Sequence, residues 1–153
     1  MNGAAWRLVK RRHAITAFSG EGARKYGGRW NLPGTPVVYA AGSMSLAVLE
    51  TLVHLDSPDL LTAFVVFQVE IPGADIEDLD QALLPRDWRA FPPSERTQKV
   101  GDLWCRGGRT VALRVPSVIV PSEFNFLLNP SHEGFVRLNI GKPSNFTFDT
   151  RLA

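Results

Sequence analysis

Short apolar runs, interrupted by glycine and proline, divide this chain into many short predicted elements. Residues 60–71 are rich in β-branched and aromatic side chains and end at Pro72-Gly73, which predicts the best strand of the chain. Other apolar runs predict further strands at residues 5–9, 37–41, 110–115, 118–120, 133–140 and 146–149, with Pro116 breaking the run between two of them.

Helix signals are fewer than strand signals. Ser43 or Ser45 can cap a helix that runs to about Leu55. A second helix is predicted to begin at Pro92-Pro93-Ser94 and to stop at Gly107-Gly108. A short helical segment is expected around Asp87-Trp88, and residues 16–28 read as a loop with one helical turn.

The order of these elements indicates the fold class. Strands outnumber helices and do not alternate with them regularly, which favours an α+β fold with a split, mixed or antiparallel sheet and flanking helices over a doubly wound fold. The chain has 153 residues and no linker, so we expect residues 1–153 to form a single domain.

Composition excludes several kinds of site. A net charge of +2 is too small to favour direct DNA binding. The single cysteine, Cys105, and three scattered histidines provide no disulfide and no metal pattern. No apolar stretch reaches the ~18 residues of a membrane span, and the first residues lack an apolar leader. These features predict a cytoplasmic protein without a membrane segment or a metal.

Glu50 is the first candidate for chemistry. On a helical wheel it lies at the edge of the predicted apolar face, next to Leu46 and flanked by His54; that face comprises residues 48, 49, 52 and 53. A carboxylate at this boundary can face a cleft beside the core. A solvated or paired boundary glutamate is the alternative.

Arg29 and Tyr39 precede Glu50 at loop and strand positions. Arg29 lies in the glycine-rich segment Gly27–Gly34, where a guanidinium can hold a phosphate bidentately. An ion pair with Glu50 is the alternative, and it would leave Arg29 near the same cleft. Tyr39 can stack on a nicotinamide or adenine ring, or can be an ordinary half-buried strand tyrosine.

A polar segment in the last third of the chain supplies further candidates. Ser122 follows Pro121 and can cap a helical turn or offer its hydroxyl to a ligand, although it lacks the surroundings of a hydrolase nucleophile. Asn125 can form turn hydrogen bonds. His132 can act as a general base or as a structural histidine.

Together these segments resemble the RES domain family, which is named for arginine, glutamate and serine positions. The resemblance covers nearly the whole chain and rests on Trp6-Arg7, Gly27–Asn31, Val38-Tyr39, Leu46–Glu50, Pro121-Ser122, Asn125, Asn129–His132 and Phe148–Leu152. It implies a fold like that of ADP-ribosyltransferases and a bacterial toxin that cleaves the nicotinamide–ribose bond of NAD+.

The resemblance also implies residue roles and partners. A cognate helix-turn-helix antitoxin of the Xre type would block the cleft. NAD+ would be the substrate, and no cofactor would be needed. By position the catalytic roles would fall to Arg29, Tyr39, Glu50 and Ser122, with Arg7, Asn125 and His132 as further cleft residues.

Two alternatives share this candidate cleft. One is a mono-ADP-ribosyltransferase that modifies a protein. Transferases often carry a second acidic residue two positions before the catalytic glutamate, where this chain has Val48, which favours hydrolysis. The other alternative is a non-catalytic module that binds a nucleotide without turnover. The acceptor of the ADP-ribosyl group is left open among water, phosphate and protein.

Overall fold

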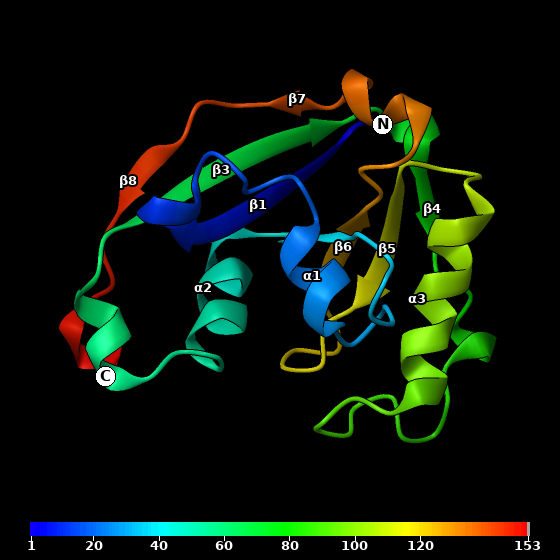
Figure 1. The fold of residues 1–153 in the computed structure, drawn as a ribbon, viewed down its shortest axis with the longest axis horizontal. Coiled ribbons are helices and arrows are strands. Elements are labelled where there is room, and N and C mark those ends of the chain that lie inside the picture. The colour runs from blue at the N-terminus through cyan, green and yellow to red at the C-terminus, as the bar shows by residue number, and fades with distance from the viewer. Residues whose placement is uncertain (153) are drawn as a thin grey trace.

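The computed structural model describes residues 1–152 and is built on one mixed sheet of eight strands (Figure 1). Only the β4–β5 pair is parallel, and the other pairs are antiparallel. This confirms the predicted α+β class. In sheet order the strands are β4 (Ile76–Asp78), β5 (Ala112–Pro116), β6 (Phe124–Leu128), β2 (Val38–Ala41), β1 (Gly3–Lys10), β3 (Phe64–Ile71) and β7 (Asn139–Ile140), with β8 (Ser144–Phe146) also paired to β3.

Three α-helices flank the sheet. They are α1 (Glu21–Tyr26), α2 (Met44–Leu52) and α3 (Glu95–Gly107), and α3 runs beside β4 and β5 (Figure 1). Ser43 caps α2 by accepting a hydrogen bond from the Leu46 amide at 3.1 Å. Short 3-10 helices connect the elements: Arg11–His13, Ser57–Leu61, Gly73–Asp75, Gln81–Leu83, Glu133–Arg137 and Thr150–Leu152.

The sheet is nearly split between β1 and β2. Strands β1 and β3 are in register from Gly3–Ile71 to Lys10–Phe64, whereas β1 meets β2 only at Trp6–Ala41. Two half-sheets therefore diverge on either side of this single pairing. Side chains from β1 and β2 line the gap between the halves instead of closing it, which creates room for a site.

The order of elements after β5 differs from the prediction. Residues Val118–Val120 are not a strand, because the Ser117 hydroxyl accepts hydrogen bonds from the amides of Ile119 and Val120 and closes a turn. The strand lies later, at Phe124–Leu128, in a segment whose asparagines and flanking prolines resemble turn residues in the sequence. Between β5 and β2 it is a central strand, and its last three residues are buried.

Smaller differences follow from local capping and turn geometry. The segment predicted as a strand from residue 133 begins as a 3-10 helix, since His132 Nδ1 accepts a hydrogen bond from the Gly134 amide at 2.8 Å. Residues 60–61 also belong to a 3-10 helix, and Asp87-Trp88 lie in a turn. The last strand ends at Phe146 instead of beginning there. Strand β4 was not predicted from the sequence.

Candidate functional site

A cavity of about 310 Å³ opens where β1 and β2 part, and α2 forms its third wall. Trp6, Leu8 and Leu55 contribute apolar surface to it. Its polar lining comes from β1, β2, β6 and α2 with the turn that follows this helix, and comprises Arg7, Tyr39, Glu50, Thr51, His54 and Asn125. The structure thus brings together four of the seven candidates, which are Arg7, Tyr39, Glu50 and Asn125.

Glu50 lies on the inner face of α2. The helix packs on the sheet through Leu46 and Ala47, both buried, and residues three or four positions later point to the same side. The predicted apolar face is therefore only half right: Val48 and Leu52 pack against the core, whereas Leu49 and Val53 are 40% and 61% exposed. The short helix buries Leu46 and Ala47 and leaves the side chains of Leu49 and Val53 exposed to solvent.

The Glu50 carboxylate is held by two donors from the far half-sheet. Its Oε1 atom accepts hydrogen bonds from Ser117 Oγ at 2.8 Å and from Asn125 Nδ2 at 2.9 Å. Its Oε2 atom has no hydrogen-bond partner among residues 1–152. The carboxylate is therefore fixed by one oxygen while the other is available to a ligand, which is the arrangement of a preorganised charge.

Ser117, which was not predicted from the sequence, is the serine that contacts Glu50. Ser117 is fully buried next to Glu50, whereas Ser122 is exposed on the turn before β6 and does not line the cavity. Both serines follow a proline, so the dipeptide alone could not separate them. The available signal was position, because Ser117 directly follows the buried strand Ala112–Pro116.

Arg7 bridges the two half-sheets. Its Nη1 donates to the Tyr39 carbonyl at 2.8 Å, and its Nε donates to the Ala17 carbonyl at 2.6 Å. Within residues 1–152 it forms no ion pair. Burial lowers the pKa of Arg7 to about 10, so the guanidinium is still charged at neutral pH. An unpaired cation in a cavity wall favours an anionic ligand such as a phosphate.

Tyr39 lines the cavity, packs against the core cluster around Trp30 and uses its hydroxyl for the fold. The hydroxyl donates to Asn31 Oδ1 at 2.5 Å and accepts from the Trp30 amide at 3.1 Å. Burial raises the pKa of Tyr39, so the phenol stays neutral. A Cβ on Gly28 would lie 2.6 Å from the hydroxyl oxygen, which explains a glycine at that position.

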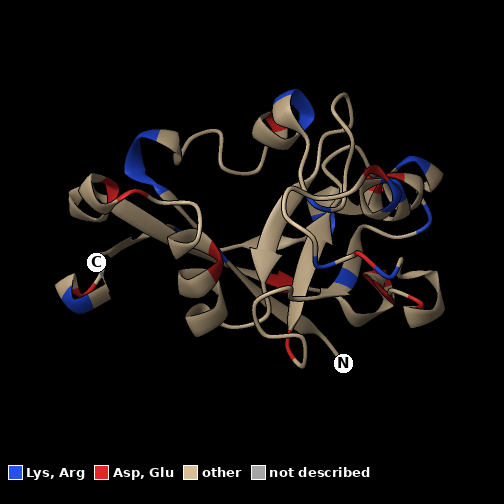
Figure 2. Cartoon of the chain, turned by 90° about the horizontal axis from the view of Figure 1, so that it is seen from below, with Lys and Arg blue, Asp and Glu red and all other residues tan. Residues whose placement is uncertain are grey.

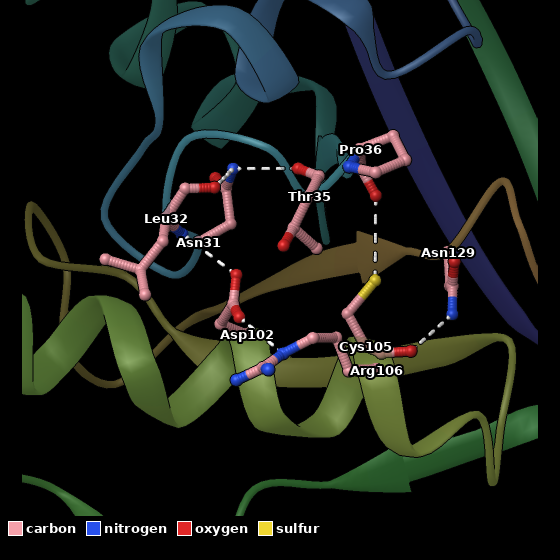
Figure 3. A network of polar contacts seen from close by, with 8 residues as sticks. All are labelled: Asn31, Leu32, Thr35, Pro36, Asp102, Cys105, Arg106 and Asn129. Carbon is pink, nitrogen blue, oxygen red and sulfur yellow. Dashed lines mark hydrogen bonds and ion pairs between the residues drawn. The ribbon is translucent and has the colours of Figure 1, made fainter.

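Helix α3 holds the loop that carries Arg29 (Figure 3). Buried Asp102 accepts a hydrogen bond from the Leu32 amide at 3.0 Å and pairs with Arg106 at 2.8 Å. Asn31 is fully buried and donates to the carbonyls of Ala23, Leu32 and Thr35. The loop is thus fixed by contacts to α3 as well as by its own turns.

Arg29 lies beside the cavity but is not part of its wall. Its Nη1 atom donates to the carbonyls of Trp88 at 2.9 Å and Ala90 at 2.7 Å, and so ties the long segment before α3 to the loop. Burial lowers the pKa of Arg29, and the nearby charge of Glu50 opposes that change. The guanidinium is therefore within electrostatic reach of the carboxylate without a direct ion pair.

His132 lies away from this cavity. It borders a second hollow between the end of α3 and the residues that follow β6. Asn125 stands near the start of β6 and Asn129 follows its end, a separation of about 13 Å along an extended strand. The structure therefore does not bring His132 to Glu50.

Charged residues are spread over the molecule. In Figure 2 the backbone positions of basic and acidic residues are interspersed, in keeping with a net charge of +2. Among the described residues, no helix is both long enough and apolar enough to cross a bilayer.

The chain belongs to the RES domain family, whose family model matches residues 4–149. It is 44% identical over 148 residues to Toxin Res of Photorhabdus laumondii (96% of this chain and 95% of that protein). It is 42% identical to Toxin Res of Yersinia enterocolitica over 96% of this chain and 97% of that protein. It is 37% identical to the Prs ADP-ribosylating toxin of a Sphingobium species, covering 99% and 98% of the two chains.

A solved structure shares the fold. A chain of the crystal structure of the M. tuberculosis MbcT–MbcA toxin–antitoxin complex aligns with a TM-score of 0.74 at 19% identity, over 96% of this chain and 85% of that one. At this identity the match bears on the fold alone, and it agrees with the α+β architecture.

Proposed function

We propose that this chain is the toxin of a toxin–antitoxin pair and that it cleaves the nicotinamide–ribose bond of NAD+. The observation that carries the proposal is the convergence of Arg7 and Glu50 on one cavity, where, within residues 1–152, the cation has no acidic partner and the carboxylate has a free oxygen. A diphosphate and a developing ribosyl cation need this pair of charges. The names of relatives that are 42–44% identical support the toxin role.

The chemistry follows from the charges. When the C1′–N bond breaks, the electron pair leaves with the ring nitrogen, and nicotinamide departs as a neutral molecule. The ribosyl group becomes an oxocarbenium-like cation, as in glycoside cleavage. The fixed Glu50 carboxylate stabilises that cation, water adds to C1′, and the water's proton passes to solvent.

The other residues bind and orient the substrate. Arg7 holds the diphosphate, and the Tyr39 ring offers a face for stacking on a base. Arg29 adds positive potential near Glu50 from outside the wall. No resident cofactor or metal has a part in this scheme.

Nicotinamide release from NAD+ tests the proposal. The purified chain is incubated with NAD+, and the products are followed by chromatography. Glu50→Gln is the variant of choice, because its amide oxygen can still accept from Ser117 and Asn125 and so preserves the fold. We expect wild-type protein to release nicotinamide and ADP-ribose and the variant to lose the activity by about 100-fold or more.

Glu123→Gln is the matched control, since Glu123 is an exposed carboxylate on the turn before β6. It should retain wild-type activity. Tight NAD+ binding without release by folded wild-type protein would instead identify a non-catalytic module. Undiminished release by Glu50→Gln would overturn the proposed mechanism.

Transfer of ADP-ribose to a protein is the second candidate. The name of the 37% identical ADP-ribosylating toxin favours it. Against it, Val48 packs against an apolar cluster where an acceptor-activating acid would be expected. Labelled NAD+ in a cell extract separates the two candidates, because transfer leaves the label on protein and hydrolysis leaves it on free ADP-ribose.

An antitoxin is the proposed partner, and Xre-type helix-turn-helix proteins are its expected class. The exposed side chains of Leu49 and Val53 lie on the outer face of the helix that carries Glu50. A partner that covers them would stand beside the cavity. This placement supports inhibition by direct obstruction of the site.

A further inference from the structure

Asn125 carries a hydrogen-bond acceptor that nothing in the structure satisfies. Its Nδ2 atom donates to Glu50 Oε1, while its buried Oδ1 has no partner within residues 1–152. Asn125 also lines the cavity. Buried polar atoms in proteins nearly always have a partner, so an orphan acceptor at a cavity indicates a donor that arrives with the ligand.

The orientation of this amide follows from its contact with Glu50 Oε1, and the hydrogen bonds of Ser117 show that this oxygen is an acceptor. The Ser117 oxygen accepts hydrogen bonds from the amides of Ile119 and Val120, both at 3.1 Å, which occupies its two lone pairs. Its only hydrogen therefore points to Glu50 Oε1, which has to accept it. The group of Asn125 that faces the same oxygen is then the NH2 donor, because a flipped amide would oppose two acceptors.

Within residues 1–152, two acceptors on these hydrogen-bonded neighbours consequently have no partner, Glu50 Oε2 and Asn125 Oδ1. A pair of neighbouring acceptors matches a pair of neighbouring hydroxyl donors, such as the cis-diol of a ribose. The carboxylate that stabilises the ribosyl cation has to lie beside C1′, so its free oxygen is nearest to the 2′-hydroxyl. Asn125 Oδ1, as the neighbouring acceptor, would then reach the 3′-hydroxyl of the same ribose.

We propose, on the basis of the function proposed above, that Asn125 Oδ1 accepts a hydrogen bond from the 3′-hydroxyl of the nicotinamide-side ribose. Asn125 is then a specificity-determining residue, and the Glu50–Asn125 pair selects ribosides with an intact cis-diol. The carboxamide of nicotinamide is a poorer donor for Asn125 Oδ1, because the nicotinamide ring is attached at C1′ and points away from C3′.

The test compares NAD+ with an analogue whose nicotinamide-side ribose lacks the 3′-hydroxyl. An analogue that lacks the adenosine-side 3′-hydroxyl is the matched substrate control. We expect wild-type protein to lose at least about tenfold in kcat/KM on the first analogue, because the acceptor stays unpaired, and to treat the control like NAD+. Asn125→Leu, which is similar in size, should process NAD+ and the first analogue within about twofold of each other.

Ser117→Ala is the matched protein control. Like Asn125→Leu it removes one hydrogen bond from Glu50 Oε1, so both variants lower kcat, but it leaves the Asn125 acceptor in place. It should therefore keep the tenfold discrimination. Equal cleavage of NAD+ and the 3′-deoxy analogue by wild-type protein overturns the proposal without any variant, as does full discrimination by folded Asn125→Leu.

The same ratios can be read from dissociation constants by calorimetry. If wild-type protein binds NAD+ but releases no nicotinamide, the proposed reaction fails while the Asn125 contact is still measured. A Kd ratio of about ten that Asn125→Leu abolishes supports the contact. A ratio near one, or no binding of NAD+ at all, contradicts it.

Discussion

At the scale of single residues, the site depends on how one carboxylate oxygen is used. Glu50 Oε1 receives two donors from the opposite half-sheet, and each donor is itself restrained. Ser117 is buried and saturated by two backbone amides, while Asn125 belongs to a central strand. In the proposed reaction, a charge held in this way would not need to reorient as the substrate becomes cationic, which would make it effective in catalysis.

Ser117→Ala should therefore impair catalysis, and Ser122→Ala should not. Loss of a hydrogen bond to a charged group is worth about 1.5–3 kcal/mol, which corresponds to roughly 10- to 100-fold in rate. Steady-state nicotinamide release by the two variants measures the difference, with circular dichroism to confirm folding. The reverse result, an inactive Ser122→Ala beside an active Ser117→Ala, would restore the role predicted from the sequence.

At the scale of elements, helix α3 works as a clamp on the loop that carries Arg29. Gly101 allows the approach, because a Cβ at this position would lie 2.1 Å from the Trp30 carbonyl oxygen. Asp102, the next residue, accepts the Leu32 amide. The helix thereby supports Tyr39 indirectly, through the Trp30 amide and the Asn31 side chain that bind its hydroxyl.

Gly101→Ala and Gly107→Ala should have opposite effects although both lie in α3. The first should destabilise the fold by about 1–3 kcal/mol, the usual cost of overpacking against a fixed group. The second meets only the end of the Arg109 side chain, at 3.5 Å, and should be neutral or stabilise the helix by about 0.5–1 kcal/mol. Urea unfolding of the two variants checks this, and equal midpoints would show that α3 does not clamp the loop.

An ion pair between two connections provides a pH test at the same scale. Arg137 binds Asp75 through two hydrogen bonds of 2.6 and 3.0 Å and holds the pKa of the Asp75 carboxyl below its usual range. A carboxyl with a depressed pKa stabilises the folded state above its unfolded pKa, near 3.9, and loses that contribution as the pH falls through the folded pKa.

The free energy of unfolding of Asp75→Asn should therefore lie below that of wild-type protein at pH 7, and the gap should close as the pH falls below about 4. Denaturation curves measured between pH 7 and pH 3 give this difference. A gap that stays constant over the whole range would mean that the ion pair contributes nothing that depends on charge.

Strong local patterns predicted some elements, and longer-range pairing decided the others. Strand β3 and the capped helix α2 follow from apolar runs and a serine at the correct position. Strand β6 could not be found this way, because its burial comes from β5 and β2 on either side. Without β6, Asn125 appeared as a turn residue, and Ser117 could not be distinguished from Ser122. The candidate Glu50 was nevertheless correctly placed at a cavity, although half of the predicted helix face is exposed.

At the scale of the whole molecule, the split sheet brings the proposed anion-binding residue and the proposed reacting centre to one cavity. Arg7 comes from one half-sheet, Tyr39 and Asn125 come from the other, and Glu50 lies on the helix that follows β2. The guanidinium of Arg7 also bonds the Tyr39 carbonyl across the gap, so the same residue joins the halves and offers a charge to the ligand. Closing the gap with regular backbone pairing would remove the cavity.

In cells, the extent of NAD+ consumption should reveal which acceptor the whole protein uses. A transferase stops consuming NAD+ when its target protein is fully modified, whereas hydrolysis has no such limit. Expression of the chain without its antitoxin should therefore drain the cellular NAD+ pool before growth stops. Expression of Glu50→Gln should leave both the NAD+ pool and the growth rate unchanged. Enzymatic NAD+ assays on samples taken through induction give the time course. Growth arrest with an undiminished pool and a single ADP-ribosylated protein would instead identify the transferase, for which the same cavity and the same Glu50 would serve.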